Sequence, residues 1–164
     1  MVRALSQILD FRSSDSVVSV LPLCHIAERM FSLIFPMYVG YTVNFAESVN
    51  TLQEDMKEIS PVAFLNVPRI WEKMHSNIMI RMQDAVFFKR WIFKAMLPIG
   101  ERVSGYKVEN KPVPLQWKFL YGIAYLLLFR TLTNQLGLLQ TRIFVSGAAP
   151  LSPDLIKFYH SVGV

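Results

Sequence analysis

The sequence predicts an α/β fold in which short parallel strands alternate with helices. Its strand candidates are short, mainly apolar runs such as 17–21 and 62–65, and a helical pattern follows each of them. Solid apolar runs are typical of strands that are covered on both faces, as in parallel sheets. At 164 residues the chain fits one domain, and 52% of its residues are hydrophobic. Because four short strands are too few for a complete doubly wound sheet, we expect part of a sheet.

The first predicted strand, 17–21, is β-branched and leads into a helix. Past Pro22 the apolar residues recur at helical spacing, and Pro36 is the expected end of that helix. Its apolar residues form one broad face. The helix also carries a narrow polar stripe, made of Glu28, Arg29 and Ser32.

A second strand is predicted at 40–45. Thr51 and Glu54 have the spacing of a capping box and begin the next helix, which Pro61 ends. The following apolar run, 62–65, is the third predicted strand.

Two long helices are expected between about residues 69 and 136. Asn66 is predicted to cap the first of them, with Pro68 in its first turn, and the helix should run from Arg69 into the nineties. A loop is expected at 104–114, followed by a second long helix over 115–136. The expected inner face of the first helix comprises Ile70, Trp71, Met74, Ile78, Met82 and Ala85.

The last predicted elements are a strand at 143–145 and a helix that begins with Ser152 as its cap and Pro153 in its first turn.

The positive charge is concentrated in the middle of the chain. The formal net charge is +5, and residues 69–118 hold ten Lys or Arg against four acids. This pattern suits an anionic lipid surface or a polyanionic ligand, and equally a solvated helix face. The uncharged run at 119–129 is shorter than the roughly 18 residues that cross a bilayer, so a buried or interfacial helix is expected there. Nucleic acid is not an expected partner, because the basic residues lack a recognition fold.

Cysteine and histidine usage restricts the chemistry further. Cys24 is the only cysteine, which excludes an internal disulfide and is compatible with a reducing cytoplasm. Residues 1–16 are not expected to form a signal peptide, since charged residues interrupt their short apolar runs. His75 and His160 lack partners at metal-ligand spacing, so no metal site is predicted.

His25 is the first candidate for chemistry. It follows a strand and a proline turn, at the carboxyl end of a strand where α/β folds usually bind ligands. It could hydrogen-bond a carboxylate or phosphate, or it could be a partly buried histidine that bonds the backbone. Cys24 beside it is not expected to be a nucleophile, because adjacent side chains seldom point at each other on a helix.

Ser146-Gly147-Ala148-Ala149-Pro150 is the second candidate. Small side chains between a strand and a helix let a ligand approach the backbone. The segment is not a phosphate-binding Walker loop, because it has no Gly-Lys-Ser/Thr. An ordinary strand–turn–helix junction would have a similar sequence.

Three collinear segments carry a resemblance to a known family. They are LPLCHIAERMF at 21–31, TLQEDMKEISPVAFLNVPRIWEKM at 51–74 and QLGLLQTRIFVSGAAPLSPDLIKFYHSVGV at 135–164. Together they resemble the adenylate-forming superfamily, and most closely its long-chain fatty acyl-CoA synthetases. The resemblance implies that residues 1–164 are an internal part of the AMP-binding (adenylation) domain.

The resemblance also implies a two-step ligation: a fatty acid and ATP give acyl-AMP and pyrophosphate, and the CoA thiol then displaces AMP. His25 matches the histidine expected beside the acyl carboxylate and α-phosphate. The segment Gly147, Ala148, Ala149 and Pro150 matches the lining of the acyl pocket and the adenosine. Arg69 matches the arginine of the family's Val-Pro-Arg motif, and Arg69 and Trp71 are expected to have structural roles. ATP, Mg²⁺, CoA and a fatty acid are the implied ligands.

Several family motifs do not occur in these 164 residues. They are the Ser/Thr/Gly-rich phosphate loop that ends in Lys, the Tyr-Gly-x-Thr-Glu motif, the ribose-binding Asp and the mobile C-terminal domain with its Lys. The expected phosphate and Mg²⁺ ligands are therefore missing, and we expect this chain alone to be inactive. The alternative is a non-catalytic module that binds a membrane surface through the basic and apolar helices. The expected location is cytoplasmic, or peripheral at a membrane.

Overall fold

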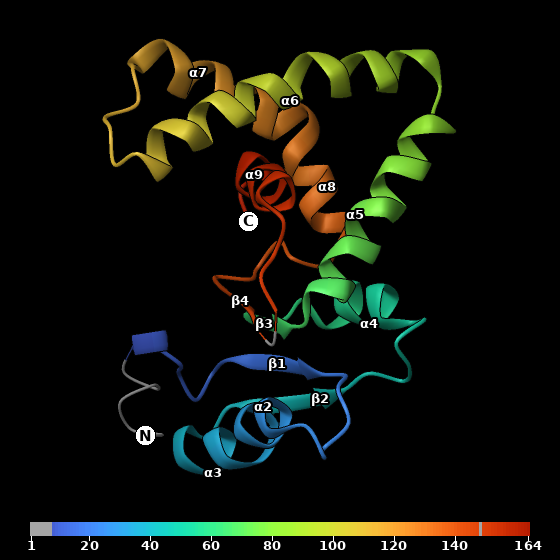
Figure 1. The fold of residues 1–164 in the computed structure, drawn as a ribbon, viewed down its shortest axis with the longest axis vertical. Helices are drawn as coiled ribbons and strands as arrows, with labels where there is room; N and C mark the ends of the chain where they lie inside the picture. Colours follow the sequence, from blue (N-terminus) through green and yellow to red (C-terminus); the bar gives the residue numbers. More distant parts are fainter. Residues whose placement is uncertain (1–7, 148) are drawn as a thin grey trace. The chain divides into compact units, whose positions relative to one another are not determined.

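The computed structural model describes residues 8–147 and 149–164 (Figure 1). The chain forms two compact units. Unit 1 contains the residues up to Asn66 together with Leu136–Val145, and unit 2 contains Val67–Gln135 and Ser146–Val164.

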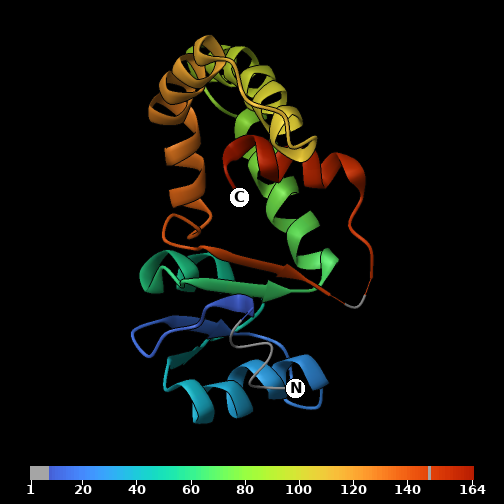
Figure 2. The same cartoon turned by 90° about the vertical axis from the view of Figure 1, so that its left-hand side faces the viewer.

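A four-stranded parallel sheet is the centre of unit 1. Its strand order is β2-β1-β3-β4, and Figure 2 shows β3 and β4 side by side and pointing the same way. The register places Ser16 opposite Thr42 and Val17 opposite Ala63. The strands are β1 (Ser16–Ser19), β2 (Thr42–Phe45), β3 (Ala63–Asn66) and β4 (Ile143–Ser146). The predicted α/β class and all four predicted strands are confirmed.

One continuous helical segment connects β1 to β2. It consists of α2 (Ile26–Arg29), the π-helical η1 (Met30–Ile34) and α3 (Phe35–Val39). The prediction that Pro36 ends this helix is wrong. Pro36 lies in the first turn of α3, directly after the π-helical turn, and the wider turn accommodates the missing N–H. The helix ends instead at Gly40, whose φ of +90° suits glycine.

Two residues of the predicted polar stripe, Glu28 and Ser32, face the sheet, whereas the third, Arg29, is exposed. Glu28 is only 3% exposed and Ser32 is also buried, whereas Ile26 is 69% exposed. The Ser32 hydroxyl donates a hydrogen bond to Glu28 Oε1, which compensates for the buried carboxylate. The predicted apolar face, to which Ile26 belongs, is therefore buried only in part.

The next helix, α4 (Leu52–Ile59), begins without the predicted capping box. The Thr51 hydroxyl accepts a hydrogen bond from the Ser48 amide at 3.0 Å and donates one to Asp55 at 3.1 Å. Its side chain thus secures the loop before the helix and does not cap the first turn. The helix packs inward through Leu52 and Met56.

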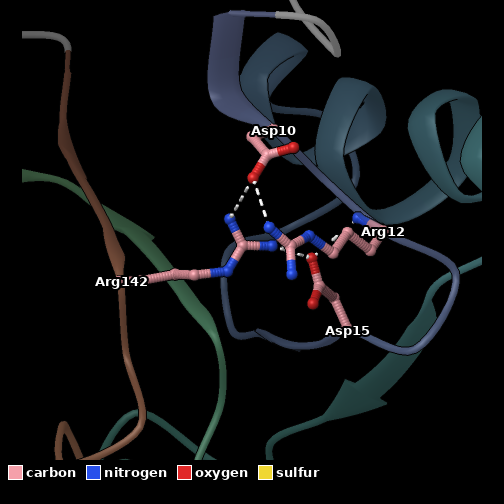
Figure 3. A network of polar contacts seen from close by, with 4 residues as sticks. All are labelled: Asp10, Arg12, Asp15 and Arg142. Atoms are coloured by element: carbon pink, nitrogen blue, oxygen red, sulfur yellow. Dashed lines mark hydrogen bonds and ion pairs between the residues drawn. The ribbon is translucent and has the colours of Figure 1, made fainter.

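A polar cluster joins the start of β4 to the loop before β1 (Figure 3). The Arg142 guanidinium forms an ion pair with the buried Asp15 and lies 3.6 Å from Asp10. Arg12 extends the cluster, because its guanidinium donates to Asp10 at 2.9 Å and its amide donates to Asp15 at 2.8 Å. The cluster connects segments about 130 positions apart in the sequence.

Unit 2 is helical. Its elements are α5 (Pro68–Gln83), α6 (Phe87–Val108), α7 (Leu115–Ala124), the π-helical η2 (Tyr125–Phe129), α8 (Arg130–Gln135) and α9 (Pro153–Val162). Both regions predicted to form long helices are helical, but the first region contains two helices, α5 and α6. The chain turns at residues 84–86, and α6 then continues to Val108, into the expected loop. Pro98 lies inside α6, at an interior position where proline usually kinks or breaks a helix.

The predicted caps of unit 2 have mixed outcomes. Ser152 caps α9 as expected, because its hydroxyl accepts a hydrogen bond from the Leu155 amide. Pro68 lies in the first turn of α5, also as expected, but Asn66 does not cap that helix. Val67 takes the cap position, and Asn66 is the last residue of β3.

Close packing of α6 on α9 holds unit 2 together. A Cβ on Gly100 would lie 2.4 Å from the Ser161 carbonyl oxygen, so only glycine fits at this contact. Lys157 of α9 also pairs with Glu101 of α6 at 3.1 Å. Between α6 and α7, the Arg102 guanidinium lies 4.8 Å from the centre of the Trp117 ring.

Candidate functional site

Polar residues follow or end two neighbouring strands of unit 1, β1 and β3, at their carboxyl ends. β1 ends at Ser19 and leads to His25, and the neighbouring strand β3 ends at Asn66. Because β1 and β3 are parallel, these ends lie at the same edge of the sheet, where open α/β sheets bind their ligands.

His25 is half-buried at the N-cap position of α2. Its amide donates to the Pro22 carbonyl at 2.8 Å, and its own carbonyl accepts from the Arg29 amide. Nδ1 of the ring is buried and has no hydrogen-bond partner among the described residues. A buried ring nitrogen without a partner is costly, so a polar group of a ligand would complete its bonding.

The loop that carries His25 is held by the helix behind it. Arg29 Nε donates to the Leu23 carbonyl at 2.7 Å, which fastens the turn between Pro22 and α2. Cys24, also in this turn, is exposed. The loop therefore presents His25 in a fixed position at the start of the helix.

Asn66 is a further candidate that the sequence analysis does not include, because its place before Val-Pro-Arg favours a helix cap. Its side chain is 1% exposed, and neither Nδ2 nor Oδ1 has a partner among the described residues. A carboxamide can donate and accept at once. The apolar strand that ends in an asparagine was the only signal of this position in the sequence.

Behind His25, the buried polar side of the helix faces a small cavity of unit 1. Glu28 and Ser32 line this cavity together with apolar residues of β1, β3 and β4. Tyr41 lies nearby, and its hydroxyl donates to the Phe31 carbonyl in the π-helical turn. Burial, and then the charge of Glu28, raise the pKa of Tyr41, so this hydroxyl stays a donor at physiological pH.

The Gly-Ala-Ala segment, the second candidate, belongs to unit 2. Ser146 ends β4, and its buried hydroxyl has no hydrogen-bond partner among the described residues. Gly147 is exposed, with open space around the position of a Cβ. Ala149 and Pro150 are exposed as well, and Ala148 lies outside the described residues.

The two predicted structural residues lie at the start of α5. Trp71 is buried, and its ring meets that of Tyr159 edge-on at 4.9 Å, while the Tyr159 hydroxyl donates to the Trp71 carbonyl at 2.8 Å. Arg69 is exposed in the first turn. The role of Arg69 stays a prediction.

The described residues offer neither a metal-binding cluster nor a membrane-spanning helix. No group of three or more His, Cys, Asp or Glu side chains in this part of the chain could hold a metal ion. None of its helices is both long and apolar enough to cross a membrane.

Comparison with known proteins gives a consistent family. Residues 1–164 match the AMP-binding enzyme family. The human long-chain-fatty-acid–CoA ligase ACSBG2 is 33% identical over 94% of this chain and 24% of its own length. Long chain acyl-CoA synthetase 1 of Arabidopsis thaliana is 32% identical over 94% of this chain and 22% of its own length. The putative fatty-acid–CoA ligase fadD11 of Mycobacterium tuberculosis is 25% identical over 98% of this chain and 28% of its own length.

The chain thus spans about a quarter of the length of the curated relatives that it matches. No solved structure matches it. Since the family match covers every residue, the chain belongs to the AMP-binding enzyme family, and its relatives there are acid–thiol ligases.

Proposed function

We propose that this chain is part of the adenylation domain of a fatty acid–CoA ligase. The proposed reaction joins a fatty acid to ATP, giving acyl-AMP and pyrophosphate, and the CoA thiol then displaces AMP. Membership of the AMP-binding family supports the use of ATP. The relatives named as long-chain fatty acid–CoA ligases support the substrate class.

The observation that carries the proposal is the unpartnered, buried Nδ1 of His25 at the carboxyl edge of a parallel sheet. We propose that His25 hydrogen-bonds the acyl carboxylate and the α-phosphate of the nucleotide. Both groups carry acceptor oxygens that a ring N–H can satisfy. Bound ATP supplies the activated phosphate, and His25 orients the carboxylate toward it.

The segment Gly147, Ala148, Ala149 and Pro150 is proposed to line the acyl pocket and the adenosine. Gly147 is exposed and unobstructed, which suits a backbone that a flat ring can approach. Trp71 and Arg69 are proposed to support the first turn of α5 and not to contact substrate.

We expect the 164 residues alone to have no synthetase activity. Their sequence contains neither a Gly-rich loop ending in Lys nor Tyr-Gly-x-Thr-Glu, so little would stabilise charge on the α-phosphate. Palmitate-dependent exchange between ATP and pyrophosphate should stay at background for the purified chain, and a rate above background would contradict this expectation.

The role of His25 can be tested in a chimera in which this chain replaces the matching segment of human ACSBG2. His25→Ala should lower palmitate-dependent ATP–pyrophosphate exchange by at least about tenfold, because a hydrogen bond to the reacting groups is lost. His160→Ala, at an exposed histidine of α9, is the matched control and should keep the rate. Full exchange in the His25→Ala chimera would refute the role.

A further inference from the structure

The corner between α5 and α6 exposes bulky apolar side chains. Val86, Phe87, Phe88 and Trp91 are all exposed, with Phe87 76% and Trp91 56% accessible to solvent. The corner is the bright-green turn where α5 meets α6 in Figure 1. Aromatic side chains of this size are seldom left in water without a partner, so a contiguous group of them indicates a binding surface.

These rings lie at helical spacing on α6. Phe87, Trp91 and Lys94 follow each other at i, i+4 and i+7, which places them on one face of the helix. The rings of Phe88 and Trp91 stack with their centres 6.4 Å apart. The first two turns of α6 therefore present an aromatic surface with a cation at its far end.

Cations surround the aromatic surface. The corner carries Arg81, Lys89, Arg90 and Lys94, all exposed, and Asp84 is the one acidic residue between positions 81 and 94. None of these four cations forms an ion pair within the described parts of the chain. The charge available at the corner is thus positive and is not neutralised by the chain itself.

We propose that this aromatic–basic corner, residues 81–94, docks on an anionic lipid surface. Aromatic rings prefer the headgroup level of a bilayer, where one side of the ring is apolar and its surroundings are wet. Each nearby Lys or Arg adds attraction to anionic headgroups. A protein partner would have to supply both acidic groups and an apolar pocket, whereas a lipid surface offers the two together. The proposal concerns unit 2 alone and does not depend on the proposed ligase reaction.

The test is binding of the purified 164-residue chain to two kinds of vesicle. One kind contains phosphatidylcholine with phosphatidylserine, and the other contains phosphatidylcholine alone. Binding should favour the anionic vesicles strongly and weaken as salt is added. The tryptophan emission should shift to shorter wavelength on binding, and Trp91→Phe should remove most of that shift, because Trp71 is buried and Trp117 is half-buried.

Two double variants separate charge from insertion. Lys89→Glu with Arg90→Glu, and Phe87→Ser with Phe88→Ser, should each lower the affinity for anionic vesicles by at least about tenfold. Phe119→Ser with Leu126→Ser changes exposed apolar residues of α7 and η2 and is the matched control, with affinity unchanged. Far-UV circular dichroism and the melting temperature confirm that each variant folds like the parent.

Several outcomes would overturn the proposal. They are no binding by the parent chain, equal binding to both vesicles, and full binding by folded variants of the corner. Loss of binding in the Phe119/Leu126 control, with the corner variants unaffected, would assign the lipid surface to α7 and η2 instead.

Discussion

At the scale of single residues, the packing of His75 makes the stability of the folded chain depend on pH. Its ring meets Phe158 edge-on at 4.5 Å, and burial lowers the pKa of His75 below its usual value. The folded chain therefore favours the neutral ring, while the unfolded chain takes up a proton near pH 6.5. As the pH falls through that value, the unfolded state binds more protons and the folded state loses stability.

His75→Phe should remove part of this acid sensitivity, because the new ring keeps the contact with Phe158 and does not titrate. The free energy of unfolding, measured by urea titration between pH 7.5 and 5.5, should fall less steeply in the variant. His160→Gln, at an exposed histidine, is the matched control and should keep the slope of the parent. An unchanged slope in His75→Phe would show that His75 does not cause the acid sensitivity.

Two glycines of α6 give a second prediction at this scale. A methyl group on Gly100 would meet the Ser161 carbonyl, whereas one on Gly105 would meet nothing within 4 Å. Gly100→Ala should therefore destabilise the chain by about 1–3 kcal/mol through overpacking. Gly105→Ala should stabilise it by roughly 0.5–1 kcal/mol, because alanine favours a helix. Thermal and urea unfolding measure both, and equal effects would contradict the close contact between α6 and α9.

At the scale of elements, the helix after β1 departs most from its predicted pattern, because it buries Glu28 and Ser32. Ser32→Leu should destabilise the chain by about 1–3 kcal/mol, since a larger side chain would crowd the sheet and remove the hydrogen bond to Glu28. Ile26→Ser, at the exposed Ile26, should change stability by less than about 0.5 kcal/mol. Amphipathic periodicity predicts the reverse order of the two effects, so urea unfolding of the two variants separates the alternatives.

The same helix shows why its sequence was misleading. Periodicity at 100° per residue assumes a regular α-helix, and the π-helical turn over Met30–Ile34 interrupts that period. Burial of Glu28 depends on a hydrogen bond from Ser32 and on the cavity beneath it, and neither is visible in the order of the residues. The π-helical turn also explains why the helix tolerates Pro36, which lies in the first turn of α3 after it.

The other elements could be predicted where local chemistry decides them. The four strands coincide with short segments rich in β-branched and aromatic residues, and the Ser152 cap and the Pro68 turn act on their own neighbours. The corner at 84–86 has no glycine or proline to mark it, and Pro98 lies inside a helix that tertiary packing maintains. Asn66 has the residue type and position of a helix cap in the sequence. Its burial at the end of β3 depends on the neighbouring strands, which the local sequence does not reveal.

At the scale of the whole molecule, the candidate site was predicted more through resemblance than through physics. His25 at a strand end is a modest signal by itself. The three collinear segments of the sequence carry the resemblance, and the family match over residues 1–164 confirms it. The structure adds the unpartnered Nδ1 of His25 and the buried Asn66 in unit 1. The basic segment was visible in composition, but its concentration with aromatic residues at one corner needed the positions of α5 and α6.

The proposal that this chain is part of a fatty acid–CoA ligase can be tested directly. The most direct measurement is the rate of palmitoyl-CoA formation by human ACSBG2 in which this chain replaces the matching segment. The proposal predicts thioester formation that requires palmitate, ATP and CoA and that falls at least about tenfold with His25→Ala. A folded chimera that binds ATP but forms no acyl-CoA with palmitate or other fatty acids would contradict it.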